Sequence, residues 1–220
     1  MSAPARQPIT SAGIVYLRKS DTAQALAETI SERLDDRGIT TWTVPSRADE
    51  EVRHLLPGTE LMIVLGGDGT ILSVARQCAE LQVPILGVNF GRVGFLSELE
   101  PEEVEEKLSL YLDGSYWIDE RSMLYAEVGS GTERSQFTAL NDIVLVRGAE
   151  PRVIRLKVWI DGHYYNTTVA DGVIISTATG STAYNLAAGG PILHPQVRSN
   201  VLTPIAPHLV ADRSLILEPA

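Results

Sequence analysis

The sequence predicts an α/β domain followed by a β-rich domain, and three observations support this fold class. The first half alternates apolar strand-like runs with apolar residues at helical spacing, which is typical of a helix-covered parallel sheet. The run LMIVLG (61–66) is apolar or glycine throughout, as in a strand buried on both faces. From about residue 116, β-branched and aromatic residues dominate between turn signals. We therefore predict a Rossmann-like domain over 1–115 and a β-sandwich-like domain over 116–220.

Strands and helices alternate along the predicted first domain. Asp21 is a candidate N-cap of the first helix, Gly38 is its stop, and Pro101 lies near the start of the last helix. A polar connection rich in acidic residues follows Pro45. We expect strands over residues 12–17, 40–44, 60–67 and 83–89, and helices over residues 21–38, 70–80 and 101–114.

The predicted second domain contains one helix candidate among its strands, over residues 180–190. Asp161-Gly162 and Asp171-Gly172 are the clearest turn signals. We expect strand structure within residues 123–129, 136–148, 154–177 and 214–218.

Composition excludes several classes of protein. Eighteen basic and 28 acidic residues give a net charge of -10, and no basic cluster offsets it, so nucleic acid and anionic membranes are not expected partners. We see neither a secretory signal nor a membrane span, and we expect a cytoplasmic protein. The lone Cys78 is expected to be a buried small hydrophobe rather than a nucleophile, and the four histidines lack metal-site spacing.

A glycine-rich turn follows the buried strand at residues 61–66. Gly67 and Gly69 permit close approach of a ligand to backbone N–H groups, and the following helix N-terminus favours anions such as phosphate. The alternative is a tight turn without a ligand. Asp68 between these glycines repels phosphate unless it bridges through Mg²⁺ or accepts a proton from a hydroxyl. A Walker loop and the dinucleotide fingerprint both fit badly, because no lysine is near and Leu72 replaces the last fingerprint glycine.

The motif GGDGT resembles the shared turn of a kinase superfamily that includes NAD kinases, lipid kinases and, more distantly, 6-phosphofructokinases. Three later motifs distinguish among these families. Together with GGDGT they resemble the NAD kinase family from about residue 60 to 213. The motifs are GVNFGRVGFL (87–96), LNDIVLVRG (140–148) and ADGVIISTATGSTAYNLAAGGPI (170–192).

The resemblance implies transfer of the γ-phosphoryl group of ATP, or of a phosphoryl group of polyphosphate, to the 2′-hydroxyl of the adenosine ribose of NAD, which gives NADP. Asp68 would orient that hydroxyl and take its proton. A divalent cation such as Mg²⁺, bound to the donor, and the turn N–H groups at Gly67 and Gly69 would carry the charge that a P-loop lysine carries elsewhere.

Two polar residues, Asn141 and Asp142, lie side by side in a strand-like run. An Asn matches the donors and acceptors of an adenine edge, and a carboxylate accepts from ribose hydroxyls. The alternative is an Asx-type turn at a strand end. The resemblance implies that both positions hold the adenosine portion of NAD.

The segment STATGSTAY places five hydroxyl residues and a tyrosine around Gly180. Such a segment offers donors, helix-start N–H groups and an aromatic face to a nucleotide, whereas a plain N-cap would explain fewer hydroxyls. The resemblance implies that this segment lines the NAD site, that Asp171 contacts the nicotinamide side, and that Ala187 stands where a serine is common. The residues implied to line the site are Thr182, Ala183 and Tyr184.

Two further residues are candidates for nucleotide contact. Phe95 either stacks on the adenine ring or packs in the core. Arg152 either neutralises a nucleotide phosphate or is a solvated surface residue.

The family pattern continues through strands beyond Ala220, so we expect a shortened chain whose activity and association are open. The resemblance implies a homodimer or homotetramer. The alternatives to an NAD kinase are a catalytically impaired NAD- or NADP-binding module and, less well matched, a GGDGT lipid kinase.

Overall fold

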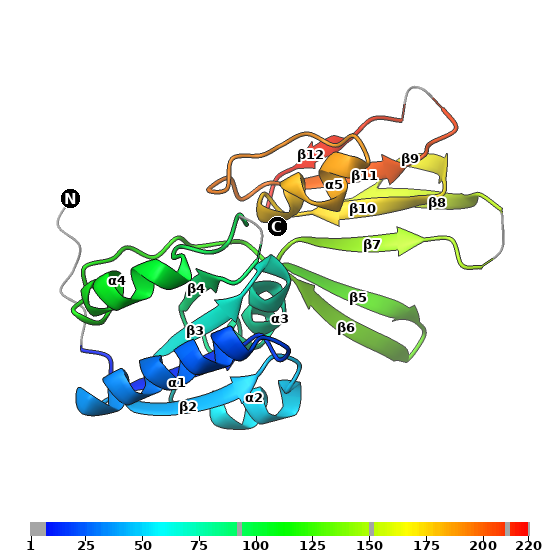
Figure 1. Ribbon diagram of the computed structural model, residues 1–220. Coiled ribbons are helices and arrows are strands. Elements are labelled where there is room, and N and C mark those ends of the chain that lie inside the picture. Colours follow the sequence, from blue (N-terminus) through cyan, green and yellow to red (C-terminus); the bar gives the residue numbers. More distant parts are fainter. Residues whose placement is uncertain (1–7, 92–93, 150–151, 210–211, 220) are drawn as a thin grey trace. The chain divides into compact units, whose positions relative to one another are not determined.

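The computed structural model describes residues 8–91, 94–149, 152–209 and 212–219. The chain divides into two compact units, Met1–Ile118 and Asp119–Ala220. The first unit contains a parallel sheet with helices, and the second is antiparallel and β-rich (Figure 1). The predicted fold class is therefore confirmed.

The first unit is built on a four-stranded sheet with the order β2-β1-β3-β4, in which all neighbouring strands are parallel. Its strands are β1 (Ser11–Tyr16), β2 (Thr40–Pro45), β3 (Leu61–Gly66) and β4 (Ile85–Asn89). Its helices are α1 (Asp21–Asp36), α2 (Asp49–Leu55), α3 (Asp68–Cys78), the 3₁₀ turn η1 (Pro101–Glu103) and α4 (Val104–Leu112).

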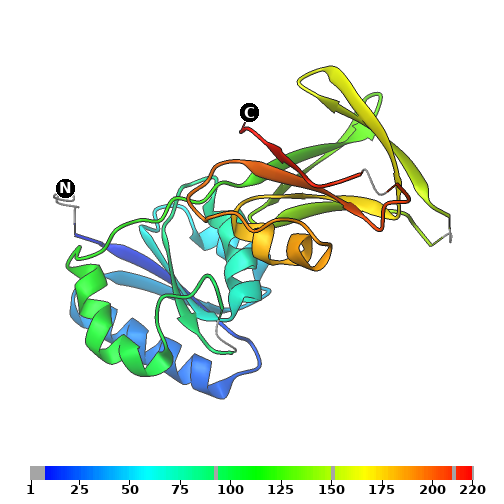
Figure 2. The same ribbon diagram turned by 90° about the horizontal axis from the view of Figure 1, so that it is seen from above.

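Strand β3 is buried along its whole length because helices cover both faces of the sheet. Ile63 and Leu65 belong to the apolar cluster formed with α1 and α4, whereas Met62 and Val64 belong to the cluster formed with α2 and α3. This alternation follows from the two-residue period of a strand. Figure 2 shows α1 and α4 together along one side of this sheet.

Three local features differ from the sequence prediction. The N-cap of α1 is Ser20 and not Asp21, because the Ser20 hydroxyl accepts a hydrogen bond from the Ala23 N–H at 3.2 Å. Helix α2 lies where we predicted a polar connection, since acidic side chains in a first turn favour a helix N-terminus and Val52 is buried. Helix α3 begins at Asp68, earlier than the predicted start at residue 70.

The second unit contains one four-stranded antiparallel sheet and two hairpins, β5–β6 and β8–β9. The order in the larger sheet is β12-β11-β10-β7. Its strands are β7 (Asp142–Val146), β10 (Gly172–Ser176), β11 (Asn200–Ile205) and β12 (Leu215–Leu217). The hairpin strands are β5 (Leu124–Ser130), β6 (Glu133–Ala139), β8 (Ile154–Ile160) and β9 (His163–Ala170), and the helical turns are η2 (Thr179–Thr182) and α5 (Tyr184–Ala187).

The turn predictions of this unit had mixed outcomes. Asp161-Gly162 joins β8 to β9 with both residues at positive φ (51° and 77°), as a two-residue hairpin turn requires. Asp171-Gly172 forms no hairpin, because β9 pairs with β8 while β10 pairs with β7 and β11. Two strands, β6 and β7, occupy the run predicted over 136–148, and β11 was not predicted.

Candidate active site

The glycine turn lies at the topological switch point of the parallel sheet. Strand β1 has β2 on one side and β3 on the other, and the connecting helices cover opposite faces. Ligands bind at the carboxyl ends of the strands at such a point. Gly67 and Asp68 follow directly after β3, and the Leu17 N–H at the end of β1 donates to the Leu65 carbonyl at 2.8 Å. The fold therefore provides a binding position at this turn.

The three glycines of this turn, Gly66, Gly67 and Gly69, do not all have the same structural reason for lacking a side chain. A Cβ at Gly66 would lie 2.6 Å from the Thr70 Oγ1, so packing in the fold excludes a side chain there. A Cβ at Gly67 or Gly69 would meet none of the described residues within 4 Å, and neither glycine has positive φ. A tight turn without a ligand thus explains Gly66 but leaves Gly67 and Gly69 unexplained.

The start of α3 offers backbone donors at this turn. Gly67 is the N-cap residue in an extended conformation, and no side chain caps the helix. The Gly67 carbonyl accepts hydrogen bonds from the N–H groups of Thr70 and Ile71. The earlier N–H groups of a helix have no intrahelical partner, and with the helix dipole they favour an anion.

Asp68 is half-buried in the first turn of α3, and its carboxylate is bound by backbone groups of the loop after β4. The Phe95 N–H donates to Oδ2 at 2.9 Å and the Leu96 N–H donates to Oδ1 at 3.2 Å. The side chain of an acidic residue in a first turn commonly serves its own helix, but here it serves a separate loop.

Phe95 has 76% of its surface exposed, so the interpretation of Phe95 as a core residue is wrong. An exposed apolar ring next to the backbone group that contacts Asp68 is available for stacking on a flat ligand.

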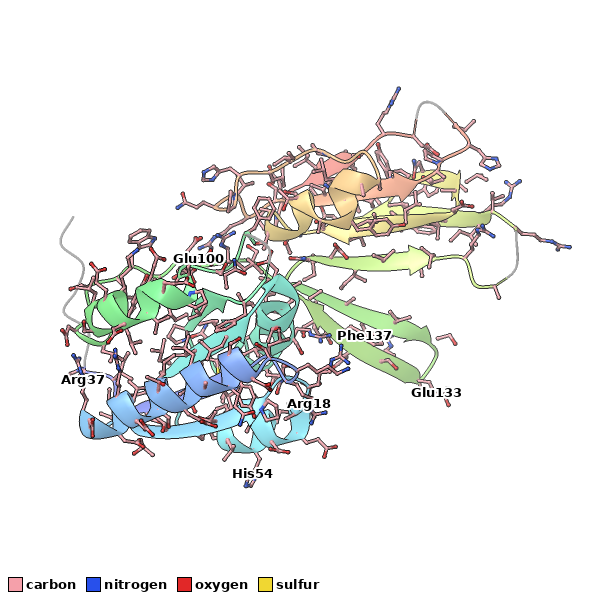
Figure 3. All side chains as sticks on the ribbon, in the orientation of Figure 1. Arg18, Arg37, His54, Glu100, Glu133 and Phe137 are labelled. Carbon is pink, nitrogen blue, oxygen red and sulfur yellow. The ribbon has the colours of Figure 1, made fainter. Side chains whose placement is uncertain are left out.

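Asn89, which the sequence analysis did not select, lies at the carboxyl end of β4 opposite Gly66. Its Nδ2 donates to Glu100 at 3.2 Å, and this partner fixes the amide orientation because a carboxylate only accepts (Glu100 is labelled in Figure 3). Asn89 is 4% exposed, and its Oδ1 has no hydrogen-bond partner among the described residues. A polar residue in an otherwise apolar strand was the available signal.

In the second unit, Asn141 and Asp142 lie at the junction of β6 and β7. Both are partly buried, and neither side chain makes a hydrogen bond within the described residues, so Asn141 forms no Asx turn there. Burial raises the pKa of the Asp142 carboxyl above its ordinary value. Two unsatisfied polar side chains at a strand start are available to a ligand.

The hydroxyl turn, residues 176–182, differs from the sequence expectation because several of its hydroxyls serve the fold. Thr177 Oγ1 donates to the Leu140 carbonyl at 2.6 Å and accepts from the Gly180 N–H at 3.0 Å. Ser181 Oγ donates to the Ala178 carbonyl at 2.6 Å. The buried hydroxyls that bond internally are those of Ser176, Thr177 and Ser181. Local structure therefore accounts for more of this segment than the sequence analysis allowed.

The residues after this turn are more accessible. Thr182 and Ala183 are half-buried, Tyr184 is 44% exposed, and Ala187 is exposed. Beneath them lies Asn185, which is fully buried: its Nδ2 donates to the Ser181 carbonyl and its Oδ1 accepts from the Thr203 hydroxyl. The sequence analysis missed Asn185, whose role is to hold α5 on the sheet.

The turn and the Asn141-Asp142 pair are neighbours in space. A Cβ at Gly180 would lie 2.1 Å from the Asn141 carbonyl oxygen, and Ser176 pairs with Asp142 in the sheet. Asp171 lies at the opposite end of β10 and forms an ion pair with Arg147 at 3.1 Å. Sequence reasoning selected Arg152, which is exposed, and missed Arg147.

Several other residue types do not contribute a site. Cys78 is buried as predicted, and burial raises the pKa of its thiol to about 12. The four histidines are exposed; Figure 3 shows His54 on the outer side of α2. Among the described residues no three His, Cys, Asp or Glu side chains form a metal-binding group. No helix in the described part of the chain has the length and apolar character needed to cross a membrane.

Comparisons with known proteins identify the chain. The model of the ATP-NAD kinase N-terminal domain matches residues 6–116, and that of the ATP-NAD kinase C-terminal domain matches residues 140–220. An NAD kinase of Dehalococcoides mccartyi (strain BAV1) is 43% identical over 207 residues, which are 93% of this chain and 73% of the relative. An NAD kinase of Caldanaerobacter subterraneus is 48% identical over 171 residues, 77% of this chain and 60% of the relative.

Solved structures agree with these matches. The yeast NADH kinase complexed with NADH matches with a TM-score of 0.81 at 27% identity. The match covers 99% of this chain and 74% of the yeast chain. An NAD kinase from Archaeoglobus fulgidus in complex with ATP has a TM-score of 0.71 at 27% identity, covering 94% and 77%.

The fold, the glycine turn and these relatives together define a phosphotransferase. The chain belongs to the ATP-NAD kinase family. Its function is that of an NAD kinase, and the two alternatives, a non-enzymatic module and a lipid kinase, are not favoured.

Proposed function

We propose that the chain transfers the γ-phosphoryl group of ATP, or a phosphoryl group of polyphosphate, to the 2′-hydroxyl of the adenosine ribose of NAD, with Asp68 as the base. The observation that carries this proposal is the start of α3, where Asp68 lies between Gly67 and Gly69 and no described residue comes within 4 Å of a Cβ at either glycine. The similarity to an NAD kinase in complex with ATP supports ATP as a donor.

Asp68 accepts the hydroxyl proton as phosphoryl transfer proceeds. A loose transition state requires little deprotonation before the donor bond breaks, so a carboxylate of ordinary basicity suffices. Each Asp68 oxygen has a second lone pair beyond the one used by the loop N–H groups. The carboxylate can therefore bind the ribose hydroxyl without losing its present contacts.

The N–H groups at the start of α3 bind the donor phosphate. Gly67 and Gly69 leave room for phosphate oxygens to approach the backbone, and the helix N-terminus stabilises their charge. A divalent cation such as Mg²⁺, bound to the donor, would neutralise part of the phosphate charge beside these N–H groups.

The second unit binds NAD. We assign the adenine edge to the Asn141 carboxamide and the ribose hydroxyls to Asp142, whose polar atoms make no hydrogen bond with the described residues. Further contacts come from the accessible segment that follows the hydroxyl turn, namely Thr182, Ala183, Tyr184 and Ala187.

Three more residues complete the assignment. Asp171 contacts the nicotinamide side while it stays paired with Arg147, since it lies at the opposite end of β10 from Asp142. Phe95, which is exposed, stacks on adenine. Arg152, also exposed, neutralises a nucleotide phosphate.

We also propose a homodimer or homotetramer in the cytoplasm. The edge strand β7 supports association, because Val144, Leu145 and Val146 are all exposed. The buried, unreactive Cys78 is compatible with a reducing compartment. Light scattering coupled to size exclusion tests the oligomer, and a monomer across the micromolar range would contradict it.

The decisive experiment incubates the chain with NAD, Mg²⁺ and either ATP or polyphosphate and measures NADP. Asp68→Asn should bind NAD as the unsubstituted chain does but lose about 10²- to 10⁴-fold in turnover, the usual contribution of a general base. Unchanged turnover would remove the base assignment, and failure to form NADP with either donor would reject the function.

A further inference from the structure

The loop after β4 determines where the Asp68 carboxylate points. Its two hydrogen bonds come from consecutive N–H groups, Phe95 to Oδ2 and Leu96 to Oδ1. Because each carboxylate oxygen has its own donor, rotation of the carboxylate about its last torsion breaks at least one bond. Within the described residues, the hydrogen bonds of the Asp68 side chain go to this loop and none goes to its own helix. The loop is therefore what orients this side chain.

Gly94 makes this contact possible. A Cβ at Gly94 would lie 2.1 Å from Asp68 Oδ1, 2.7 Å from Cγ and 3.0 Å from Oδ2. Gly94 does not have positive φ, so backbone conformation gives no reason for glycine at this position. The reason is the carboxylate itself, which occupies the place of the missing side chain.

The donors are fixed because the loop is anchored to β4. The Gly87 carbonyl accepts from the N–H groups of Glu98 and Leu99 at 3.0 and 3.1 Å, and the Asn89 N–H donates to the Leu99 carbonyl at 2.8 Å. A Cβ at Gly87 would lie 3.0 Å from the Leu96 carbonyl oxygen, so the loop also packs closely on the strand. The sheet thus fixes the position of the loop, and the loop N–H groups fix the position of the Asp68 carboxylate.

We infer that Gly94 is a positioning residue for phosphoryl transfer, acting through the Phe95 and Leu96 N–H groups that set the Asp68 carboxylate. This inference rests on the proposed function, in which Asp68 is the base. The loop bonds occupy one lone pair of each oxygen and leave the other lone pair for the acceptor hydroxyl. Displacement of the carboxylate by a small distance is costly in turnover, because proton transfer requires hydrogen-bond reach.

The test compares two alanine substitutions in the same loop. Gly94→Ala should lower kcat at least tenfold while KM for NAD changes less than threefold. Gly91→Ala is the matched control, because among the described residues the atom nearest to its Cβ would be Asn89 Oδ1 at 3.9 Å, which is ordinary contact. Equal kcat for Gly94→Ala and Gly91→Ala would overturn the inference.

A double-substitution cycle separates positioning from a general structural role. With a labelled phosphoryl donor, adding Gly94→Ala to Asp68→Asn should change the residual rate less than twofold, because the residue through which Gly94 acts is already disabled. A further tenfold loss in that background would show that Gly94 acts independently of Asp68 and would contradict the inference.

A second pair of variants, with Asp68→Ala in place of Asp68→Asn, keeps the inference testable if Gly94→Ala folds poorly. Removing the carboxylate should remove the clash, so the double variant Asp68→Ala/Gly94→Ala should melt within about 2 °C of Asp68→Ala, and a much lower melting temperature would contradict the inference. Failure of the proposed base and failure of the Gly94 inference give different results. Full turnover of Asp68→Asn would reject Asp68 as the base. An inactive Asp68→Asn variant together with a fully active Gly94→Ala variant would reject only the role of Gly94.

Discussion

The glycine turn after β3 and the hydroxyl turn after β10 look similar in the sequence, because both lead from a buried strand to a helix start through small residues. In the structure they differ. The glycine turn leaves open space around Gly67 and Gly69, whereas the hydroxyl turn bonds Thr177 and Ser181 to nearby backbone. The comparison shows how to tell whether packing requires a small residue or whether the residue leaves room for a ligand. The test is which atoms a larger side chain at that position would contact.

Their glycines make this difference measurable, and Gly180→Ala should have the largest effect on stability. Its Cβ would lie 2.1, 2.4 and 2.6 Å from the O, C and Cα atoms of Asn141. Backbone atoms cannot move away as a flexible side chain can, so we expect a loss of about 3 kcal/mol in the free energy of unfolding.

Urea denaturation measures this loss. Gly148→Ala is the control in the same unit, because a Cβ there meets no described residue within 4 Å and Gly148 lacks positive φ. If both variants unfold at the same urea concentration, the close approach of the hydroxyl turn to Asn141 is not a constraint on the fold.

Gly69→Ala should have the opposite effect on stability and a large effect on activity. Gly69 lies in the first turn of α3 with open space around it, so alanine should raise the free energy of unfolding by about 0.5 kcal/mol. The added methyl occupies the approach to the helix N-terminus. We expect at least a tenfold rise in KM for the phosphoryl donor.

Steady-state kinetics with varied ATP and thermal melting, both measured beside Gly148→Ala, check this prediction. A more stable Gly69→Ala variant with unchanged KM would indicate that the phosphate does not approach the backbone at this turn.

Sequence patterns predicted the first unit better than the second, for a physical reason. Strand β3 is buried on both faces, so its apolar run is a strong signal, and the alternation of strands and helices determined the parallel sheet. In the second unit, β11 carries Pro204 and polar residues within a sheet, and the buried set includes Ser176, Asn185 and Thr203. Hydrogen bonding between distant residues stabilises these positions, and a single sequence does not display such pairs.

The same reasoning applies to the candidate site. The motif containing Asp68 was recognisable, but its partners Phe95 and Leu96 act through backbone N–H groups, which leave no mark on residue identity. Gly94 was equally hidden, since a glycine selected by the packing of a carboxylate looks like any loop glycine. The pairing of Asp171 with Arg147 depends on the strand arrangement and was not predicted.

Asp142→Asn should have a small effect on stability, and the size of that effect depends on pH. Burial raises the pKa of Asp142 in the folded state, so the folded protein bears a cost whenever this carboxyl is ionised. That cost is fully present above the raised pKa and disappears as the pH falls through it toward the unfolded value. Asparagine removes the cost, and it should therefore stabilise the protein at pH 7 and give no gain at pH 3.

The gain at pH 7 should be under about 1 kcal/mol, because solvent screens a half-buried charge. Urea denaturation at both pH values measures it, with Glu133→Gln at the tip of the β5–β6 hairpin as a control for removing one negative charge (Figure 3). The same variant should raise KM for NAD about tenfold, since a charged acceptor for the ribose hydroxyls is lost. The contrary result is a loss in the free energy of unfolding at pH 7 that is absent at pH 3, each measured against the unsubstituted chain. That result would mean that the Asp142 carboxylate stabilises the fold, as the Thr177 hydroxyl does, and is not available to a ligand.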